Sequence, residues 1–536
     1  MEHYLPEIFW HDRKALLSVD FQKIEQKDRY KIVTTSVQKE VRIWEFEFEV
    51  VNGKNERASL AVNFVANLVG HSGAVNVARF SPDGKLLASG DCEGSIFVWK
   101  VGPITAQNDL IVSGSDDMPP NKENWIRARQ PFRHDSDVCA LCWNLDGTLI
   151  ASVSNDDSVL VHNVLTGKRV WSIRNHHHFP EGIVWDPRGK YLITLSTDRK
   201  LDIIDAVKGS KLKCISSAEL PDTFIHDVQM KKGVYKLFHD DQLMSFSRGC
   251  DFSPDGELLF APCAHLEVHE SNVYGTYVFR RKDFPKSQPF AFLPSSQPTH
   301  RVACCPLMFS LCPNVKENAL GVPYRILWAI MTKDSVTVYD SQSFYPFAYV
   351  DNIHYNNLSD IAWSPDGSIL LISSLEGYCS FLRFDLSSVG EVMESVPSPP
   401  PSPVLVQPKK KGRPPKCETE NPAASPKAAE KGLLASDPVQ SAEVTPSRPL
   451  VGTKITTPKT RSIINYFKKS SASISKAHIA EKEDNHNNID LDITIISEPC
   501  PEVAPVQSSS TSTPTAASTK VKKRASLISV PPITLD

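Results

Sequence analysis

The chain has 536 residues and carries 59 Lys and Arg against 62 Asp and Glu, a nearly neutral balance. Its apolar stretches are far shorter than the roughly 20 residues that span a bilayer, and its first residues lack the basic start and apolar run of a signal peptide. These features argue against a membrane-spanning or secreted protein, so we expect a soluble chain in a reduced, intracellular compartment.

The two parts of the chain differ in composition. Residues 1–386 hold all nine tryptophans and have 40 Lys and Arg against 47 Asp and Glu. Residues 387–536 hold no tryptophan, 20 of the 40 prolines, and 19 Lys and Arg against 15 Asp and Glu. A segment so poor in aromatic residues cannot bury enough apolar surface to offset the entropy of ordering it. We therefore predict one large domain over residues 1–386 and a disordered tail with short linear motifs over residues 387–536.

The first part is built from short alternating strands joined by a recurring turn. An aromatic residue ends one strand, a glycine follows four positions later, and a second strand begins, as in a β-hairpin. The five copies are residues 80–84, 143–147, 185–189, 252–256 and 363–367. Weaker copies are centred on Phe21 and Phe309, which brings the count to seven.

A second fixed spacing supports the same repeat. His71 precedes Trp99 by 28 residues, and the same interval separates His134 from His162 and His176 from Ile204. This spacing is typical of WD repeats, in which each repeat supplies a four-stranded blade of a β-propeller. We predict an all-β fold with about seven four-stranded blades, six or eight being the alternatives. We also expect residues 4–10 to close the ring as the outer strand of the last blade.

An insertion before the third blade combines acidic residues with a tryptophan. Asp109, Asp116, Asp117 and Glu123 lie near Trp125, a mixture suited to a basic or amphipathic partner. The alternative is a solvated loop.

Metal sites, cofactor sites and catalytic motifs find no support in the sequence. Cys139 and Cys142 have the spacing of half a zinc site, but they lie within an alternating strand and no second pair follows. The triplet His176-His177-His178 falls on the blade histidine position. No phosphate-binding loop, nucleophile elbow or carboxylate pair appears in its required context. We expect no cofactor and no enzymatic activity.

Several segments outside the repeats resemble one family. These are residues 74–82, 121–125, 238–241, 323–325, 334–336, 346–350, 352–355 and 358–360. In them the chain resembles the WD-repeat middle subunits of chromatin assembly factor 1, over about residues 1–386. The resemblance implies a nuclear, non-enzymatic scaffold subunit of a histone chaperone that deposits histones H3 and H4 on newly replicated DNA and also serves DNA repair.

The same resemblance implies a set of partners. They are a large subunit, a small histone-binding WD-repeat subunit, histones H3 and H4, the anti-silencing-function chaperone and the replicative sliding clamp. An acidic propeller face would attract basic histones through a field that salt screens.

A basic motif near the start of the tail is similar to an AT-hook. It consists of Lys409, Lys410, Lys411, Gly412, Arg413 and Pro414. An extended arginine of this type lies in the narrow minor groove of A·T-rich DNA, and one such motif would bind weakly. The same residues also fit a nuclear import signal.

A cluster of apolar residues in the tail is similar to a sliding-clamp-binding box. Ile463, Tyr466 and Phe467 lie three and four residues apart and would share one face of a short helix. Thr460 stands where the clamp-binding pattern prefers glutamine. The alternatives are another partner or no role.

A basic and then apolar segment close to residue 536 resembles the one by which this family engages the anti-silencing-function chaperone. Its residues are Lys522, Lys523, Arg524, Leu527 and Ile528, with Ala525 in place of the usual isoleucine. Such a segment can add a strand to an exposed sheet edge. A second import signal is the alternative.

Three Ser/Thr-Pro sites fit cell-cycle kinases, namely Ser425, Thr445 and Thr457. A phosphate on Thr457 would add up to about two negative charges beside the clamp-like box, and we expect it to tune recruitment. Two other functions remain open for the whole chain. One is a substrate receptor of a ubiquitin ligase, and the other is a chromatin-tethered transcriptional corepressor.

Overall fold

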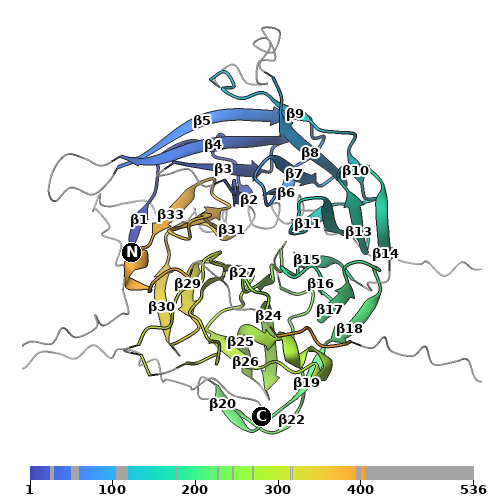
Figure 1. Cartoon of the computed structure of the whole chain (residues 1–536), viewed down its shortest axis with the longest axis vertical. Helices are drawn as coiled ribbons and strands as arrows, with labels where there is room; N and C mark the ends of the chain where they lie inside the picture. Colours follow the sequence, from blue (N-terminus) through green and yellow to red (C-terminus); the bar gives the residue numbers. More distant parts are fainter. Residues whose placement is uncertain are drawn as a thin grey trace, which may run out of the picture. The chain divides into compact units, whose positions relative to one another are not determined.

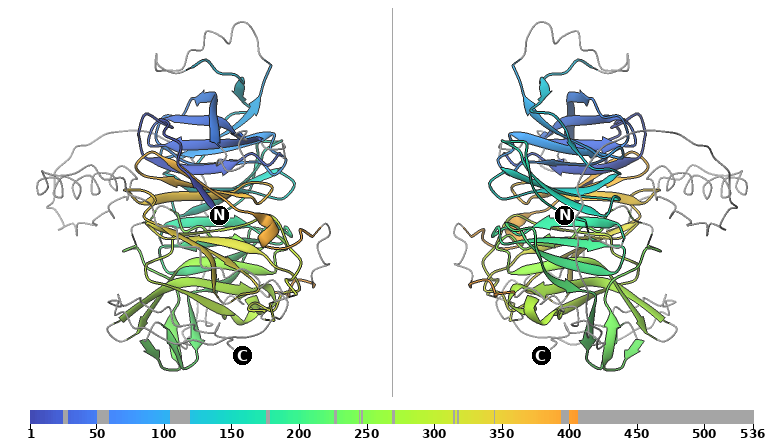
Figure 2. Two further views of the ribbon diagram at one scale, coloured as in Figure 1. Left: turned by 90° about the vertical axis from the view of Figure 1, so that its left-hand side faces the viewer. Right: turned by 90° about the vertical axis from the view of Figure 1, so that its right-hand side faces the viewer.

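A ring of seven sheets forms the structure (Figure 1). The computed structural model describes residues 1–24, 29–49, 59–103, 119–174, 178–225, 228–243, 245, 247–268, 271–313, 315–316, 318–343, 345–393 and 400–405. Each sheet has a four-stranded antiparallel path, and the sheets follow one another around a central channel in Figure 1. Figure 2 shows the same ring from two sides. The seven-bladed all-β propeller predicted from the repeats is confirmed.

The blades are numbered in chain order. Blade 1 contains β2 (Leu16–Phe21), β3 (Arg29–Ser36), β4 (Glu40–Glu49) and β5 (Ser59–Val69). Blade 2 contains β6 (Val75–Phe80), β7 (Leu86–Asp91), β8 (Ser95–Val101), β9 (Trp125–Arg127) and β10 (Phe132–Arg133). Blade 3 contains β11 (Val138–Trp143), β12 (Leu149–Ser154), β13 (Ser158–Asn163) and β14 (Arg169–Arg174). Blade 4 contains β15 (Pro180–Trp185), β16 (Tyr191–Ser196), β17 (Lys200–Asp205) and β18 (Lys211–Ile215).

The remaining blades carry more irregular segments. Blade 5 contains β23 (Asp251–Phe252), β24 (Leu258–Val268), β25 (Ser271–Arg280) and β26 (Ala291–Ser295), with the 3-10 helix η2 (Arg281–Lys286) before β26. Blade 6 contains β27 (Arg301–Cys304), β28 (Leu327–Met331), β29 (Ser335–Asp340) and β30 (Pro346–Asp351). Blade 7 contains β31 (Leu358–Trp363), β32 (Ile369–Ser374), β33 (Cys379–Arg383) and β1 (Glu2–Tyr4). Between blades 4 and 5 lie two small hairpins, β19 (Ser217–Leu220) with β22 (Gly233–Lys236) and β20 (Thr223–Ile225) with β21 (Val228–Met230).

The core of the described residues is divided between the blades. Seven clusters of buried apolar side chains each join two adjacent blades, and the seventh joins blade 7 to blade 1. Both faces of each blade are therefore buried, and strands such as β2, β16 and β32 are buried at every position and not only at alternate ones.

The recurring turn is held by its own polar residues. In residues 81–86 the Ser81 hydroxyl donates to Asp83 Oδ1 at 2.6 Å and accepts from the backbone N–H of Leu86 at 2.9 Å. Gly84 has a φ of +66°, a conformation that other residues rarely adopt. Ser253 and Ser364 make the same two bonds in blades 5 and 7.

The 28-residue spacing corresponds to one position in the blades. Trp99 pairs across the sheet with Leu87, which pairs with Phe80 at the end of β6. His162 and Ile204 occupy the same register in blades 3 and 4. The predicted equivalence of these three residues is confirmed.

The N-terminal segment closes the ring, as predicted, but the predicted bounds 4–10 are wrong, because the strand consists of residues 2–4 and shares only Tyr4 with them. Glu2–Tyr4 pairs antiparallel with β33 as the outer strand of blade 7. Trp10 lies beyond the strand, where its buried ring packs against Trp44 and Phe381. It belongs to the core between blades 7 and 1.

The predicted aromatic anchor at Phe309 in blade 6 is wrong. The inner strand ends at Cys304, and the N–H of Cys305 bonds to the carbonyl of Leu327, as Ser81 bonds to Leu86 in blade 2. Cys304 therefore takes the aromatic position. Phe309 lies in the insertion that follows and pairs with Arg325 and Val392.

The described part of the insertion in blade 2 is bound to the propeller. Glu123 forms an ion pair with Lys31 at 2.5 Å and accepts from Trp125 Nε1 at 2.9 Å. Trp125 is buried in the core between blades 1 and 2. These two residues thus support the fold, while Asp109, Asp116 and Asp117 lie outside the described residues.

Contacts with the propeller continue past residue 386. The 3-10 helix η3 (Leu386–Ser388) is followed by the buried Val389, and the N–H of Met393 bonds to the carbonyl of Met308. Residues 400–405 return to the propeller between blades 4 and 5.

Candidate functional site

The motifs proposed for the tail lie outside the described residues. They are the AT-hook or import motif Lys409 to Pro414, the clamp-like box, the chaperone-binding-like segment and the three kinase sites. His176 also falls outside, whereas Cys139 and Cys142 lie in the core strand β11, as the sequence predicted. The candidate site that the structure does describe is the central channel.

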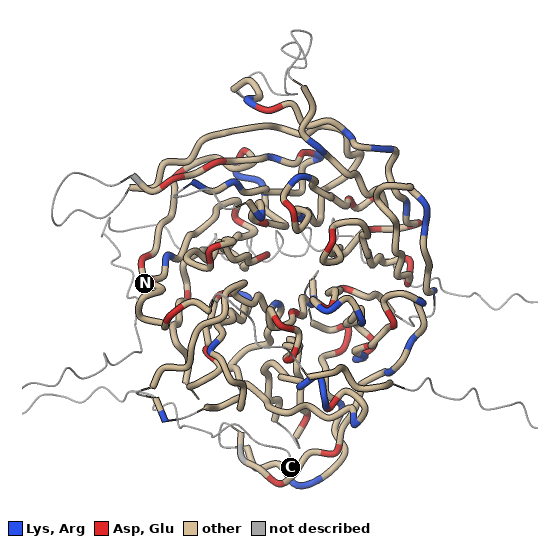
Figure 3. The backbone as a smooth tube through the Cα atoms, in the orientation of Figure 1, with Lys and Arg blue, Asp and Glu red and all other residues tan. Residues whose placement is uncertain are grey.

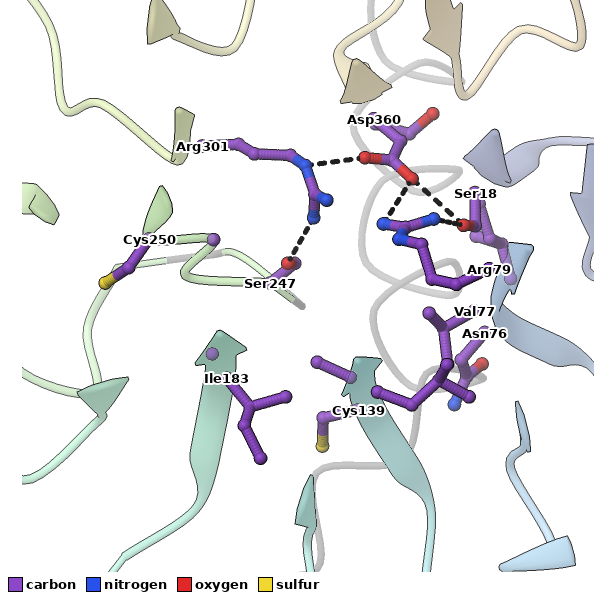
Figure 4. A pocket seen from close by; sticks show the side chains of 16 residues that line it. Ser18, Asn76, Val77, Arg79, Cys139, Ile183, Ser247, Cys250, Arg301 and Asp360 are labelled. Carbon is purple, nitrogen blue, oxygen red and sulfur yellow. Dashed lines mark hydrogen bonds and ion pairs between the residues drawn. The ribbon is translucent and has the colours of Figure 1, made fainter. Parts of the chain in front are cut away.

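Two arginines share one aspartate at this channel (Figure 4). Arg79 Nη2 lies 2.9 Å from Asp360 Oδ2, and Arg301 Nε lies 2.8 Å from Asp360 Oδ1. Ser18 donates its hydroxyl to Asp360 Oδ2 at 2.9 Å, and Arg301 Nη1 donates to Ser247 Oγ at 3.3 Å. We call Arg79, Asp360 and Arg301 the channel triad.

The triad brings together strands that are distant in the sequence. Arg79 comes from β6, Arg301 from β27 and Asp360 from β31, so one carboxylate joins blades 2, 6 and 7. Asp360 also accepts the backbone N–H of Val19 in blade 1 at 3.0 Å. Its carboxylate therefore links blades 1, 2, 6 and 7 at the channel, whereas β1 closes the ring at the outer edge of blade 7.

Electrostatics keep the triad ionised. Burial would raise the pKa of Asp360, but Arg301 and Arg79 hold that pKa below its ordinary value. Burial would lower the pKa of Arg79, which Asp360 and Asp20 instead raise. Burial lowers the pKa of Arg301 below its ordinary value. Removing one member of such a buried set leaves an unpaired charge and typically costs about 3–5 kcal/mol.

Other aspartates join neighbouring blades in the same way. Asp20 accepts the N–H of Phe80 at 2.9 Å, and Asp251 accepts the N–H of Cys304 at 2.8 Å. Burial raises the pKa of Asp251 to about 6. These carboxylates satisfy backbone donors across the gaps between blades, which is a structural role.

The cavity at the triad has a volume of about 40 Å³. A site for an organic ligand usually measures about 300–1,000 Å³, whereas a water molecule needs about 10–15 Å³. The channel thus accommodates a few water molecules among paired charges. This arrangement suits a rigid scaffold better than a substrate pocket.

Histidines contribute a second kind of stabilising contact, a hydrogen-bond network within a blade. His71 bonds to Asp91 Oδ2 at 2.8 Å and to Ser89 Oγ at 2.6 Å, and Trp99 Nε1 donates to the same hydroxyl at 2.8 Å. Burial lowers the pKa of His71, so the ring is neutral near pH 7. The blade histidine thus has the structural role that the repeat predicts.

Sequence reasoning missed the channel triad. Its members are separated by up to 281 residues, so no local spacing relates them. A charged residue directly precedes the last aromatic residue at Asp20, Arg79 and Asp251, but this pattern includes only Arg79 of the triad. Arg301 and Asp360 lie three residues before the ends of their strands. Figure 3 shows acidic and basic positions interspersed around the channel.

Comparison with known proteins places this propeller in a family. The statistical model described as the CAF1B/HIR1 beta-propeller domain matches residues 1–389. The chain belongs to the CAF1B/HIR1 beta-propeller family. The match spans the seven blades together with η3 and Val389.

Several members of the CAF1B/HIR1 family are similar over most of this chain. The CAF1B subunit of chromatin assembly factor 1 from Mus musculus is 37% identical over 404 residues, which cover 73% of this chain and 68% of the mouse protein. The protein of the same name in Saccharomyces cerevisiae is 32% identical over 408 residues, covering 71% and 85%. Protein hir1 of Emericella nidulans is 26% identical over 381 residues, covering 68% and 34%.

Metal-binding clusters and membrane spans are both absent from the part of the chain that the structure describes. There, no group of three or more His, Cys, Asp or Glu side chains could hold a metal ion. No described helix is long and apolar enough to cross a membrane.

Proposed function

We propose that this chain is a non-enzymatic scaffold subunit of a histone chaperone complex that deposits histones H3 and H4 on newly replicated DNA. The observation that carries the proposal is the 37% identity, over 73% of the chain, to the CAF1B subunit of chromatin assembly factor 1 from Mus musculus. We place the activity in the nucleus, in replication-coupled chromatin assembly and in DNA repair.

Physical features of the propeller support a scaffold role. The channel triad pairs its charges internally, and the cavity beside it is of water size. Residues 1–386 carry 40 Lys and Arg against 47 Asp and Glu, a balance that favours basic partners such as histones.

The proposed partners follow from the same kinship. They are the large subunit and the small histone-binding WD-repeat subunit of chromatin assembly factor 1, histones H3 and H4, and the anti-silencing-function chaperone. We assign the chaperone to the segment 522–528 and the sliding clamp to Ile463, Tyr466 and Phe467. The motif 409–414 would serve nuclear import or weak contact with A·T-rich DNA.

Affinity purification from replicating cells tests the proposal. The full chain should carry its tag after residue 536, because β1 at the other end pairs within blade 7. We expect mass spectrometry to recover the two other subunits together with H3 and H4. Recovery of ubiquitin-ligase adaptors or transcriptional corepressors without histones would contradict the proposal.

A variant of the clamp-like box tests the tail. Changing Ile463, Tyr466 and Phe467 to alanine should remove the clamp from the purified material and leave the other subunits. Changing Ile493, Ile495 and Ile496 to alanine is the matched control, because it removes three apolar side chains elsewhere in the tail. Equal clamp recovery from both variants would exclude the box as the clamp site.

A further inference from the structure

Residues 400–405, which we call the proline segment, lie against the junction of blades 4 and 5. The segment is drawn in dark orange beside β18 in Figure 1. Arg188 Nη1 donates to the carbonyl of Pro400 at 3.0 Å, and Tyr191 Oη donates to the carbonyl of Pro403 at 2.9 Å. Leu405 packs against the apolar core between the two blades.

The surface at the junction of blades 4 and 5 is suited to binding a proline-rich segment. Proline has no backbone N–H, so such a segment presents mainly carbonyl acceptors. The surface at the junction supplies side-chain donors for these carbonyls. Lys190 Nζ donates to the carbonyls of Ser402 and Pro403, at 3.4 and 3.1 Å, beside the contacts from Arg188 and Tyr191. Proline also limits the entropy lost on docking because its φ is fixed.

Arg281 forms the floor beneath Ser402. Its Nη1 and Nη2 bond to the Oδ1 and Oδ2 atoms of Asp186 at 2.8 and 2.5 Å, a pair that is almost fully buried and joins blade 4 to blade 5. Nη1 also donates to the carbonyl of Gly256 at 2.9 Å. Nε donates to Ser402 Oγ at 2.7 Å.

Three cationic side chains therefore contact the segment at or near Ser402, and one of them contacts its hydroxyl. Arg281 contacts Ser402 Oγ, Lys190 contacts its carbonyl, and Arg188 binds the segment two residues earlier. Two of these side chains have acidic partners as well, since Arg188 pairs with Glu257 and Arg281 pairs with Asp186. The third, Lys190, is exposed, and its ammonium group donates to the carbonyls of the segment. A phosphate on Ser402 would meet Arg281 and Lys190 directly.

Ser402 precedes Pro403, the dipeptide that proline-directed kinases modify. We propose that Ser402 is a phosphorylation site for a proline-directed protein kinase, and that the phosphate stabilises the binding of the proline segment to blades 4 and 5. A phosphoserine adds about 1.5 to 2 negative charges and three strong acceptor oxygens. Arginine and lysine bind such oxygens by charge-assisted hydrogen bonds.

The reaction uses ATP as the phosphoryl donor. Ser402 Oγ attacks the γ-phosphorus, the new O–P bond replaces the bond to the bridging oxygen of ADP, and the hydroxyl proton leaves to the base of the kinase. Because Oγ lies against Arg281 in the half-buried docked segment, the kinase acts on the segment while it is released. The phosphate then returns with the segment and holds it.

Phosphorus NMR on the full chain tests the docking. Phosphoserine is incorporated at position 402 alone, and the phosphate is titrated. We expect its second pKa to lie about one unit below that of a free phosphopeptide of residues 397–407, because neighbouring cations stabilise the dianion. Lys190→Ala should shift it back towards the peptide value. Lys208→Ala, an exposed lysine on another turn of blade 4, is the control and should leave it unchanged.

A value equal to that of the peptide, and indifferent to Lys190→Ala, would overturn the docking. A second measurement tests the modification itself. A proline-directed kinase and ATP are given to the full chain, with Ser402→Ala as the blank and the peptide 397–407 as the positive control. Mass spectrometry should find phosphate on Ser402. Modification of the peptide but not of the full chain would overturn the assignment.

Discussion

Blades 2 and 6 reach one architecture by different means. At the equivalent register blade 2 has Phe80, Leu87 and Trp99 on its first three strands, whereas blade 6 has Cys304, Trp328 and Tyr339. The first strand of blade 6 thus ends in a small side chain, and the large aromatic side chain, Trp328, lies on the second strand. In blade 6 Trp328 stacks between Phe260 and Tyr339, with ring centroids 4.6 and 5.9 Å away.

The polar network differs in the same two blades. Ser89 in blade 2 binds both His71 and Trp99, and the equivalent residues in blades 1 and 3 are Thr34 and Ser152. In blades 5, 6 and 7 this position is Ala261, Ile330 and Ile372. At this position blades 1 to 3 thus have a buried hydroxyl, whereas blades 5 to 7 have an apolar side chain. A WD-like blade needs a filled core and a fixed register more than it needs its signature residues.

The largest expected effect comes from removing the displaced ring. Trp328→Ala should lower the free energy of unfolding by about 3–5 kcal/mol, because a large cavity opens between blades 5 and 6. Trp328→Phe is the control and should cost much less, since Trp328 Nε1 has no hydrogen-bond partner among the described residues. Thermal unfolding followed by circular dichroism measures both variants. A loss in Trp328→Phe as large as that in Trp328→Ala would contradict this account, because phenylalanine keeps an aromatic ring at the position.

A smaller effect is expected from breaking the network of blade 2. Ser89→Ala leaves the buried indole N–H of Trp99 without its acceptor and Nε2 of His71 without the hydroxyl it contacts, which should cost about 1–3 kcal/mol. Ser89→Thr keeps the hydroxyl, as Thr34 does in blade 1, and should restore most of the stability. If alanine is as stable as serine in the same unfolding experiment, the contrast between the two kinds of blade fails.

The smallest expected effect is a dependence of stability on pH through His11, which lies between β1 and β2 and contacts blade 1. His11 bonds to Thr34 Oγ1 at 3.0 Å, and burial lowers its pKa from 6.5 to about 3. The folded protein keeps the ring neutral while the unfolded chain takes up a proton below pH 6.5. This contribution is therefore complete above pH 6.5 and is lost as the pH falls towards 3.

The loss between pH 7 and pH 5.5 should be about 1 kcal/mol for this one residue. His11→Gln removes the titration, so the melting-temperature difference between the natural chain and the variant should narrow as the pH falls. A difference that stays constant over this range would show that His11 does not titrate with unfolding.

The sequence was sufficient for the features that repeat. The turn phrase and the 28-residue interval are local, so the seven blades and the equivalence of Trp99, His162 and Ile204 could be predicted. The aromatic anchor of blade 6 was misplaced because the large side chain, Trp328, lies on the second strand of the blade. The repeat pattern expects an aromatic residue at the end of the first strand.

The features that do not repeat were beyond the sequence. The channel triad depends on pairing between strands of three different blades, which no interval within one repeat records. The binding of residues 400–405 depends on Arg188, Lys190 and Arg281, whereas composition alone groups those residues with the tail. Tertiary contacts, and not local preference, decide both.

The closure of the ring by β1 has a consequence for synthesis. His3 leaves the ribosome 377 residues before Ser380, to which its ring bonds at 3.0 Å. At about 5–20 residues per second the first strand waits roughly 20–75 s for its partner. Until then the growing chain carries an unpaired strand edge of the kind that promotes aggregation. A ribosome that stalls before Cys379 has therefore made β31 and β32 of blade 7 but not β33, the strand with which β1 pairs.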